Sequence, residues 1–157
     1  MLVERCHVSD GTKAKGIEMC AKIVVTGGAG TCGAVCIDRL LDDDNFEEVW
    51  SVDNNEGALF FQKEHYKNSR KYRAAMIDIR DTANLKFAFS EADAVIHCAA
   101  YKNVPMCEIS PSSCVSTNIN GTENIINAGI SQNVKTVIFT SSDKAVNPTN
   151  IMGATKF

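Results

Sequence analysis

The residues with the clearest chemical potential form one short run near the end of the chain. Ser141, Ser142, Asp143 and Lys144 follow an apolar segment, so hydroxyl, carboxylate and amine groups stand next to one another. Such a group can supply a proton donor, a proton acceptor and an orienting hydrogen bond. Taken alone, the run also fits a polar loop that caps the next helix.

A second signature lies near the start of the chain. Gly27, Gly30 and Gly33 have the Gly-x-x-Gly-x-x-Gly spacing, a variant of the dinucleotide-binding fingerprint. Gly27 would permit a tight turn, Gly30 a close approach of the backbone to a pyrophosphate, and Gly33 close packing of helix on strand. A helix that begins at Thr31 and Cys32 would turn its unpaired N–H groups and positive dipole end toward the phosphates.

Acidic residues follow the next two apolar segments. Asp53, twenty positions after Gly33, could accept hydrogen bonds from both ribose hydroxyls and would repel a 2′-phosphate. No arginine follows it within three residues, so NAD is the favoured cofactor and NADP the alternative. By fold analogy, Asp78 and Ile79 are assigned to an adenine pocket, whereas Asp81 fits the N-cap of the next helix.

The elements that must position these residues alternate along the chain. Short apolar runs predict strands at 22–26, 48–53, 72–77, 94–98 and 136–140, and amphipathic segments predict helices near 31–41, 56–66, 82–89 and 112–132. Strands separated by helical crossovers imply a doubly wound parallel sheet of Rossmann type. We expect five strands in the order 3-2-1-4-5.

Several of these elements carry expectations about burial. The continuous apolar runs at 23–25 and 137–139 predict strands buried on both faces. Cys32 and Cys36 lie one helical turn apart and are interpreted as small buried apolar side chains, so no metal site is expected. The helix near 112–132 has apolar residues at helical spacing that predict one buried stripe: Val115, Ile119, Ile126 and Ile130.

The fourth strand ends where ligands bind in open α/β sheets. Ala99 and Ala100 are small enough for a cofactor to lie against the backbone, and Lys102 could meet an anionic substrate. His97 has apolar neighbours, so it is expected to pack within the strand rather than act in catalysis.

Composition narrows the function classes. The 157 residues suit one domain, which we place at 22–157 after a lead-in at 1–21. A net charge of −3 argues against nucleic-acid binding, which needs a basic face. No apolar run is long enough for a membrane span, and no secretory signal is evident, so a cytoplasmic protein with reduced thiols is expected.

Several of these residues belong to longer motifs, and in these motifs the chain resembles the UDP-N-acetylglucosamine 4,6-dehydratases of the polysaccharide-biosynthesis branch of the extended short-chain dehydrogenases. The similarity runs from about residue 22 to residue 156. It rests on three motifs: His97-x-Ala99-Ala100-x-Lys102-x-Val104-Pro105, Thr117-Asn118-x-x-Gly121-Thr122-x-Asn124, and Ser141-Ser142-Asp143-Lys144-Ala145-Val146-Asn147-Pro148 followed by Met152-Gly153-Ala154-Thr155-Lys156.

The resemblance implies a lyase reaction on a UDP-sugar. A hydride leaves sugar carbon 4 for NAD, the carbon 5 proton is abstracted, water leaves from carbon 6, and the hydride returns to carbon 6. In this scheme Asp143 protonates the departing hydroxyl, Lys144 takes the carbon 5 proton and Ser142 hydrogen-bonds the carbon 4 oxygen. Lys156 binds the nicotinamide ribose. Lys102 and Asn118 are tentative substrate contacts.

Met152 departs from the Tyr-x-x-x-Lys pattern of the wider superfamily. A thioether cannot remove a proton, so the base for carbon 4 remains open between Asp143, Lys144 and a water molecule. Some members of this dehydratase branch also carry Met there. Nucleotide-sugar epimerases usually keep the Tyr, which weighs against an epimerase.

The sequence ends one residue after Lys156, whereas family members continue into a substrate-binding region. We therefore expect a C-terminally truncated domain with incomplete helix cover near its fifth strand, and a homo-oligomer in the full-length form. Two further hypotheses stay open: an NAD-binding module without turnover, and a related epimerase.

Overall fold

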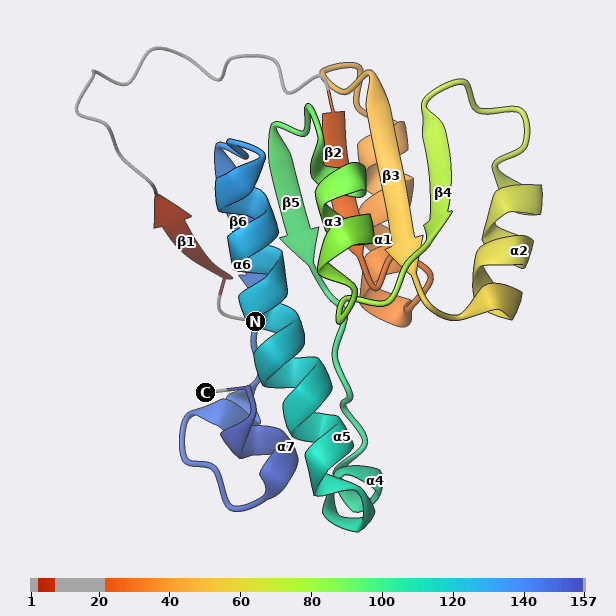
Figure 1. The fold of residues 1–157 in the computed structure, drawn as a ribbon. Helices are drawn as coiled ribbons and strands as arrows, with labels where there is room; N and C mark the ends of the chain where they lie inside the picture. Colours follow the sequence, from red (N-terminus) through yellow and green to blue (C-terminus); the bar gives the residue numbers. More distant parts are fainter. Residues whose placement is uncertain (1–2, 8–21, 157) are drawn as a thin grey trace.

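The computed structural model describes residues 3–7 and 22–156, with side chains described for 22–156, and it contains one six-stranded sheet (Figure 1). The sheet has the order β1-β6-β5-β2-β3-β4. Its strands are β1 (Val3–His7), β2 (Lys22–Thr26), β3 (Glu48–Asp53), β4 (Tyr72–Met76), β5 (Ala94–His97) and β6 (Thr136–Thr140).

Helical segments connect the strands. They are α1 (Thr31–Leu41), α2 (Glu56–His65), α3 (Thr82–Phe89), α4 (Val104–Ile109), α5 (Pro111–Val115), a π-helical turn η1 (Ser116–Asn120), α6 (Gly121–Ser131), a 3₁₀ turn η2 (Asp143–Ala145) and α7 (Ile151–Ala154). The predicted elements are thus present, and the predicted helix near 112–132 is built from three consecutive segments.

The parallel part of the sheet confirms the predicted architecture. Strands β2 to β6 pair in parallel as β4-β3-β2-β5-β6, which is the expected order 3-2-1-4-5. The sequence did not predict β1, which pairs antiparallel with β6 at the edge of the sheet. It falls within the proposed lead-in at 1–21, of which the remaining residues lie outside the described part of the chain.

Two hydrophobic cores cover the two faces of the sheet. Val24 belongs to the core beneath α3 and α6, whereas Ile23 and Val25 belong to the core that includes Ile37 of α1. These three residues of β2 are all buried, as predicted for a strand covered on both faces. This burial fixes the position of the loop that leaves the end of β2.

The expectation for β6 was wrong. Its five residues are all half-buried, although the run at 137–139 predicted burial on both faces. Val137 packs against the core beneath α6, with its methyl group 3.5 Å from where a Cβ on Gly129 would lie. On the opposite face α1 contacts β2 and β3, so β6 lies beyond the cover of that helix (Figure 1).

The predicted buried stripe of the long helix was also wrong. Val115, Ile119, Ile126 and Ile130 are 39–65% exposed. The buried face instead carries a different set of residues at equally regular helical spacing: Cys114, Asn118, Gly121, Ile125 and Ala128.

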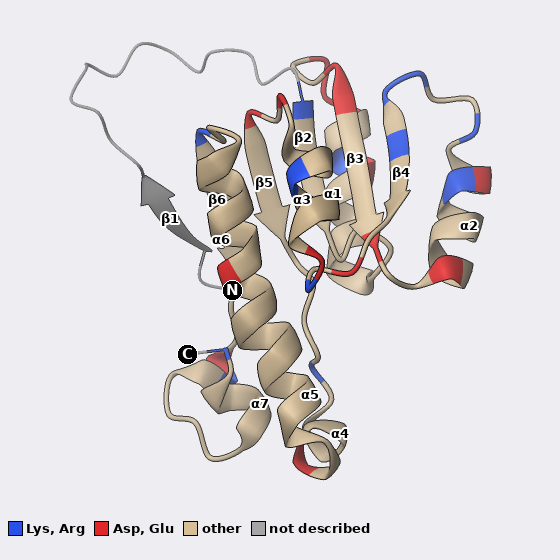
Figure 2. Ribbon diagram, viewed as in Figure 1, with Lys and Arg blue, Asp and Glu red and all other residues tan. Residues whose placement is uncertain are grey.

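The physical reason is close packing of the helix on the segment after β4. A Cβ on Gly121 would lie 2.6 Å from Cδ1 of Ile79, so a larger residue there would force the Ile79 side chain to move. The exposed face is almost free of charge, because Glu123 is the one charged residue between Pro111 and Ser131 (Figure 2).

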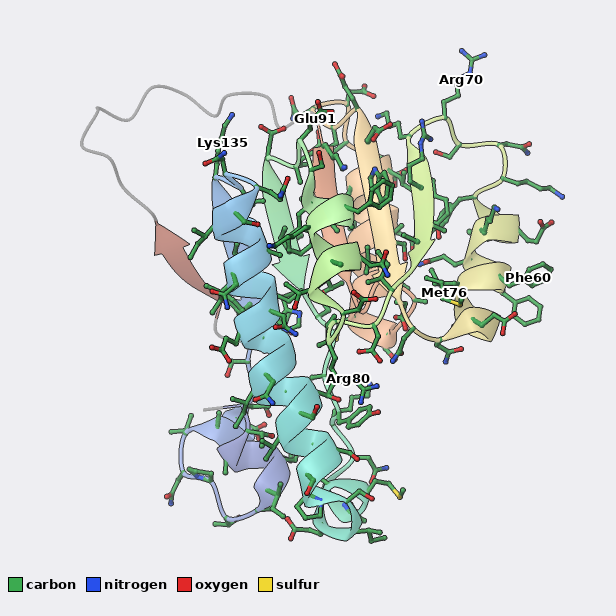
Figure 3. All side chains as sticks on the ribbon, in the orientation of Figure 1. Phe60, Arg70, Met76, Arg80, Glu91 and Lys135 are labelled. Carbon is green, nitrogen blue, oxygen red and sulfur yellow. The ribbon has the colours of Figure 1, made fainter. Side chains whose placement is uncertain are left out.

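The opposite edge of the sheet carries a smaller apolar patch. Phe60 of α2 and Met76 of β4 are 58% and 66% exposed and lie on the outer side of the molecule (Figure 3). A shallow groove between α2 and β4 includes both residues. This groove shares no lining residue with the principal cleft, which opens at the carboxyl ends of the parallel strands.

Candidate cofactor-binding and active site

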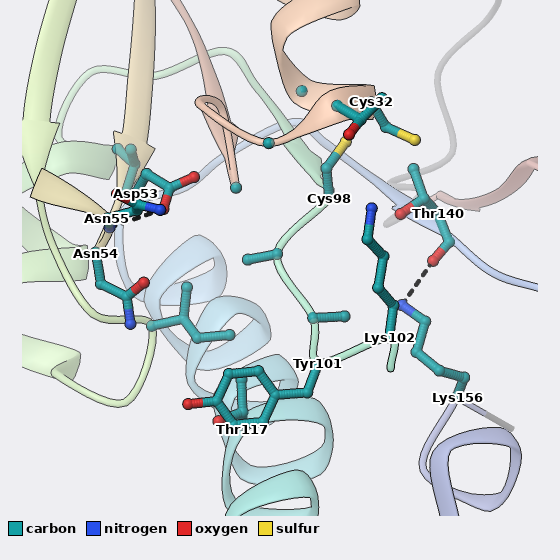
Figure 4. Close-up of a pocket in the computed structure, with 18 of the residues that line it drawn as sticks. Cys32, Asp53, Asn54, Asn55, Cys98, Tyr101, Lys102, Thr117, Thr140 and Lys156 are labelled. Atoms are coloured by element: carbon teal, nitrogen blue, oxygen red, sulfur yellow. Dashed lines mark hydrogen bonds between the residues drawn. The ribbon is translucent and has the colours of Figure 1, made fainter. Parts of the chain in front are cut away.

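The principal cleft lies where the parallel strands end and has a volume of about 540 Å³ (Figure 4). Every residue predicted to bind the cofactor lines it: Gly27, Gly30, Thr31, Cys32, Gly33, Asp53, Asp78, Ile79, Ala99, Ala100 and Lys156. Ser142, Lys144, Met152 and Lys102 also line it, whereas Asp143 and Asn118 do not. The two signatures found far apart in the sequence therefore meet in one cleft.

The glycine turn has the geometry that its spacing predicts. Gly27 has a φ of +69°, and a Cβ there would lie 2.5 Å from the backbone nitrogen of Ala99. A Cβ on Gly33 would lie 2.1 Å from the carbonyl oxygen of Gly27. A Cβ on Gly30 would meet only that same carbonyl, at 3.2 Å, so the backbone at Gly30 is open toward the cleft.

Helix α1 begins at the cleft without a side-chain cap. Its N-cap is Gly30, and its first turn, which includes Thr31 and Cys32, has no acidic residue. The first N–H groups of a helix have no partner within the helix, and the dipole favours negative charge there. The sequence thus places an anion-binding helix end beside the glycine turn.

Asp53 at the end of β3 is tied to the glycine turn. Its Oδ2 accepts a hydrogen bond from the Ala29 nitrogen at 3.1 Å, and its Oδ1 accepts one from the Asn55 nitrogen at 3.0 Å. These bonds fix the carboxylate at the mouth of the cleft while leaving lone pairs for a ribose hydroxyl. Asn54 and Asn55 also line the cleft, although the sequence analysis did not single them out.

Asp78 is held by a neighbouring arginine. Its carboxylate accepts hydrogen bonds from Nε and Nη2 of Arg80, at 2.9 and 2.5 Å. The bond from the Arg80 side chain is the main cause that lowers the pKa of Asp78 to about 2. Asp81 accepts from the nitrogens of Ala83 and Asn84, which confirms its role as the N-cap of α3.

Thr117 is a cleft residue that the sequence analysis left without a role. It is 8% exposed and lies in the π-helical turn, and its hydroxyl has no hydrogen-bond partner among the described residues. Buried hydroxyls normally have partners, so this one is available to a ligand. Tyr101, which is 42% exposed, also lines the cleft (Figure 4). A π-helical turn often marks a functional site, but no sequence pattern predicts it.

Asn118 holds two segments together from outside the cleft. Its Oδ1 accepts from the Tyr101 nitrogen at 2.8 Å, and its Nδ2 donates to the Tyr101 carbonyl at 3.0 Å and to Oγ1 of Thr155 at 2.9 Å. These bonds use the polar atoms of a side chain that is 4% exposed. In this structure Asn118 fixes the loop after β5 and the residue before Lys156.

His97 is buried in a closed hydrogen-bond network. The Thr122 hydroxyl donates to the Asn118 carbonyl at 2.6 Å, so it accepts from Nε2 of His97 at 3.1 Å. Nδ1 then accepts from the Thr26 hydroxyl at 2.7 Å. Burial, followed by the nearby Lys156 charge, lowers the pKa of His97 to about 3. The imidazole is therefore a neutral packing group, as the sequence predicted.

The other end of the cleft carries the Ser-Asp-Lys run. The Ser142 hydroxyl donates to Oδ1 of Asp143 at 3.0 Å, and Nζ of Lys144 lies 3.6 Å from the same oxygen. The Ser142 hydrogen bond and the Lys144 charge lower the pKa of Asp143, so its exposed side chain is a carboxylate at neutral pH. Lys144 faces the cleft, and Asp143 lies beside it on the outer side.

Met152 and Lys156 complete this end. Met152 is 4% exposed and packs with Cys107 and Cys114, so it presents an inert thioether to the cleft. Lys156 donates from Nζ to the Thr140 carbonyl at 2.9 Å, and partial burial lowers its pKa. The hydrogen bond aims this amine along the end of β6.

The two cysteines beside the glycine turn differ in environment. Cys32 is exposed, so its predicted burial was wrong; its place in the first turn of α1 turns it toward the cleft opening rather than the sheet. Cys98 is half-buried, and burial, aided by the neighbouring Cys36, raises the pKa of its thiol to about 12.

Comparison with known proteins connects this cleft to a family. Residues 23–157 match the model of a family described as polysaccharide biosynthesis protein. An uncharacterised membrane protein of Methanocaldococcus jannaschii is 46% identical over 134 residues, and a UDP-N-acetylglucosamine 4,6-dehydratase (inverting) of Campylobacter jejuni is 38% identical over 134 residues. A UDP-glucose 4-epimerase of Rickettsia massiliae is 33% identical over 141 residues. Each match covers 85% of this chain, which spans 40% of the length of these curated relatives.

Solved structures agree on the fold. Pen from Bacillus thuringiensis superposes with a TM-score of 0.83 at 38% identity, covering 87% of this chain and 41% of that one. A dTDP-glucose 4,6-dehydratase of Streptomyces venezuelae, solved with NAD bound, has a TM-score of 0.78 at 25% identity, covering 86% of this chain and 48% of that one. Among the described residues, none of the helices combines the length and apolar character needed to cross a bilayer.

Proposed function

Because the chain belongs to the polysaccharide biosynthesis protein family, we propose that it binds NAD and serves a nucleotide-sugar 4,6-dehydratase reaction on UDP-N-acetylglucosamine in the cytoplasm. The observation that carries this proposal is the convergence of Ser142, Lys144, Met152 and Lys156 on the same cleft as the glycine turn. The dehydratase relative at 38% identity supports the reaction class.

The cleft fits a dinucleotide on its own geometry. The uncapped start of α1 and the open backbone at Gly30 suit a pyrophosphate, Asp53 suits a ribose, and the unpartnered Thr117 hydroxyl suits a polar ligand atom. Arg80, which could otherwise attract a 2′-phosphate, is already paired with Asp78, so NAD is preferred to NADP. When bound, NAD accepts a hydride from sugar carbon 4 and later returns it to carbon 6.

The side chains at the other end would move the protons. Lys144 faces the cleft and takes the carbon 5 proton, and Ser142 orients the carbon 4 oxygen. Asp143 must gain a proton before it can donate one to the departing hydroxyl. A sugar that covers this exposed carboxylate would raise its pKa by desolvation and so favour protonation. Lys156 binds the nicotinamide ribose.

A 4-epimerase is the competing activity, since relatives at 33% identity carry that name. Met152 favours the dehydratase, because an epimerase of this type relies on a tyrosine hydroxyl at that position and a buried thioether offers no proton to exchange. The two reactions give products of different mass, so they are separable by one measurement.

The apolar stripe formed by Val115, Ile119, Ile126 and Ile130 is the surface to which we assign the proposed homo-oligomer. Sedimentation equilibrium with Ile126→Asp, which puts a charge in the middle of the stripe, checks this assignment. A monomeric full-length wild type would contradict it.

The test of the proposed function has two stages. Calorimetric titration with NAD and with NADP measures binding, and we expect NAD to bind more tightly. Mass spectrometry after incubation with NAD and UDP-N-acetylglucosamine then detects a 4-keto-6-deoxy product as the loss of one water. Lys144→Met should retain NAD binding and lose this product.

Each outcome distinguishes one hypothesis. An isomer of unchanged mass identifies an epimerase, and NAD binding without any product identifies a cofactor-binding module. A wild-type chain that binds neither NAD nor NADP overturns the proposal.

A further inference from the structure

A glutamine outside the cleft contacts the glycine turn. Gln62 of α2 does not line the cleft, yet its Nε2 donates to the Gly28 carbonyl oxygen at 2.9 Å. Its Oε1 accepts from the Ser51 hydroxyl at 2.6 Å and from the Tyr72 hydroxyl at 3.0 Å. One side chain thus links α2, β3 and β4 to the turn that begins the proposed phosphate site.

The Gly28 carbonyl determines which way the Gln62 amide points. Ser51 is fully buried and Tyr72 is 7% exposed, and both donate to the same atom of Gln62. The Gly28 carbonyl oxygen can only accept a hydrogen bond, so the amide nitrogen must face it, and the amide oxygen then accepts from both hydroxyls. The donor to the Gly28 carbonyl is therefore fixed by its surroundings rather than by free rotation of the side chain.

The contact holds one end of a single peptide unit. The Gly28 carbonyl and the Ala29 N–H belong to the same planar peptide, and the N–H donates to Oδ2 of Asp53 at 3.1 Å. Gln62 and Asp53 therefore hold this peptide from its two sides, one by a hydrogen bond to the carbonyl and the other by a hydrogen bond from the N–H. Because glycine tolerates many backbone conformations, a peptide that follows Gly28 would rotate readily without such a grip.

The gripped peptide lies directly before the anion-binding helix end. Only one peptide separates it from Gly30, the N-cap of α1. Its rotation would displace Gly30 and with it the N–H groups of Thr31 and Cys32, which have to converge on the phosphates. The carbonyl of the buried Gly28 would also lose its partner.

From these contacts we infer that Gln62 is a positioning residue that sets the affinity of the cleft for the pyrophosphate of a dinucleotide. The inference rests on the proposed binding of NAD. It assigns part of that affinity to α2, a helix with no residue in the lining of the cleft. It also explains why a polar side chain reaches across β3 between two buried hydroxyls.

Gln62→Glu is the most informative variant, because it keeps the shape of the side chain and replaces the amide NH2 group, the hydrogen-bond donor, with an oxygen. The introduced carboxylate still accepts from Ser51 and Tyr72, but it has no hydrogen for the Gly28 carbonyl and repels that oxygen. ADP-ribose, which contains the pyrophosphate, and adenosine, which lacks it, are the two probes. Asn127→Asp, at an exposed position of α6, is the control with the same change in charge.

We expect Gln62→Glu to weaken ADP-ribose binding about tenfold at pH 8, the effect of a lost hydrogen bond with an unpaired carbonyl. Adenosine binding should change by less than about twofold, within the error of a surface substitution. As the pH falls, the introduced carboxyl gains a proton and can donate again, so the defect relative to wild type should shrink. Tyr72→Phe, which removes one of the two donors to the Gln62 amide oxygen, should weaken ADP-ribose binding by a smaller factor.

The outcomes separate this inference from the proposed function. If wild type binds neither probe, the proposed NAD site is wrong. If wild type binds both and Gln62→Glu binds ADP-ribose as wild type does, the positioning role is wrong. Equal weakening for both probes, or a defect that does not shrink at low pH, also overturns it, because general damage to the fold would act in that way. If Gln62→Glu fails to fold, the Tyr72→Phe comparison with the same two probes decides.

Discussion

The two ends of the cleft differ in what holds them in place and in how exposed their residues are. At the nucleotide end, backbone packs against backbone: Gly33 lies against the Gly27 carbonyl, and the peptide after Gly28 is held by hydrogen bonds on both sides. At the other end the charged pair Asp143 and Lys144 is exposed, with 88% of the Asp143 side chain and 49% of the Lys144 side chain open to solvent.

This difference assigns cofactor binding mainly to the nucleotide end and the proposed proton transfers to the other end. The nucleotide end is held in place by the described residues themselves, so its geometry exists before a ligand arrives. The Ser-Asp-Lys end is held by contacts among neighbours in sequence, and its carboxylate is ionised. We therefore expect substitutions at the first end to affect folding and binding together, and those at Ser142, Asp143 and Lys144 to affect turnover alone.

The largest expected effect comes from Gly33→Ala. Its new methyl group would lie 2.1 Å from the Gly27 carbonyl oxygen and 2.7 Å from the Gly28 Cα, and neither backbone atom can move aside cheaply. We expect the free energy of unfolding to fall by at least about 3 kcal/mol and NAD binding to be lost. Denaturant titration and calorimetry measure the two effects.

Gly57→Ala is the matched control. The nearest atom to a Cβ there is Oδ1 of Asn55 at 3.8 Å, and Gly57 lies in the first turn of α2, where alanine is the better helix former. It should raise stability by about 0.5 kcal/mol and leave NAD binding unchanged. If both variants behaved alike, the packed-backbone account of the nucleotide end would be refuted.

An intermediate effect is expected from acid. The pKa of His97 is about 3 in the folded chain, where burial is the main cause, against 6.5 for an ordinary histidine. Below pH 6.5 the unfolded chain binds a proton that the folded chain does not, so stability is full above that pH and falls progressively toward pH 3. The expected loss between pH 7 and pH 5 is about 2 kcal/mol, measured by urea unfolding.

His97→Gln tests the assignment, because an amide can donate and accept within the same pocket but does not titrate in this range. Its stability at pH 7 should be lower than that of wild type, and the loss from pH 7 to pH 5 should largely disappear. An unchanged pH dependence would mean that groups other than His97 carry the acid sensitivity.

The order of the parallel strands was predictable because the same pattern, a short apolar run followed by an amphipathic segment, repeats along the chain. Each strand was a short apolar run and each crossover an amphipathic segment, and the glycine spacing fixed the first turn, which the positive φ of Gly27 confirms. Periodicity gave the wrong buried face for the helical segments at 111–131, because two sets of residues there have helical spacing. The stripe with Val115 and Ile119 is more hydrophobic, but close approach to Ile79 requires the small residue Gly121 on the other face.

The residues that line the cleft were largely predictable from the sequence, whereas the residues that hold the lining in place were not. Residues at the ends of strands meet at one edge of a parallel sheet, so their convergence follows from topology. The Gln62 contact depends on a side chain that crosses from a helix to a loop 34 residues earlier, and no local pattern encodes it. The buried hydroxyl of Thr117 depends on a π-helical turn and was missed for the same reason.

The smallest expected effect concerns thiol reactivity at the boundary between the two ends. With a pKa of about 12, the Cys98 thiol is ionised in only about one molecule in ten thousand at pH 8, whereas Cys32 is exposed in the first turn of α1. Iodoacetamide at pH 8, followed by peptide mass mapping, should label Cys32 well before Cys98. Cys32→Ser should remove the early product, and NAD should slow it, because a ligand at the start of α1 would cover that thiol. Labelling of Cys98 as fast as Cys32 would show that the interior of the cleft is as accessible as its rim, and the nucleotide end would then lack the rigidity that distinguishes it here.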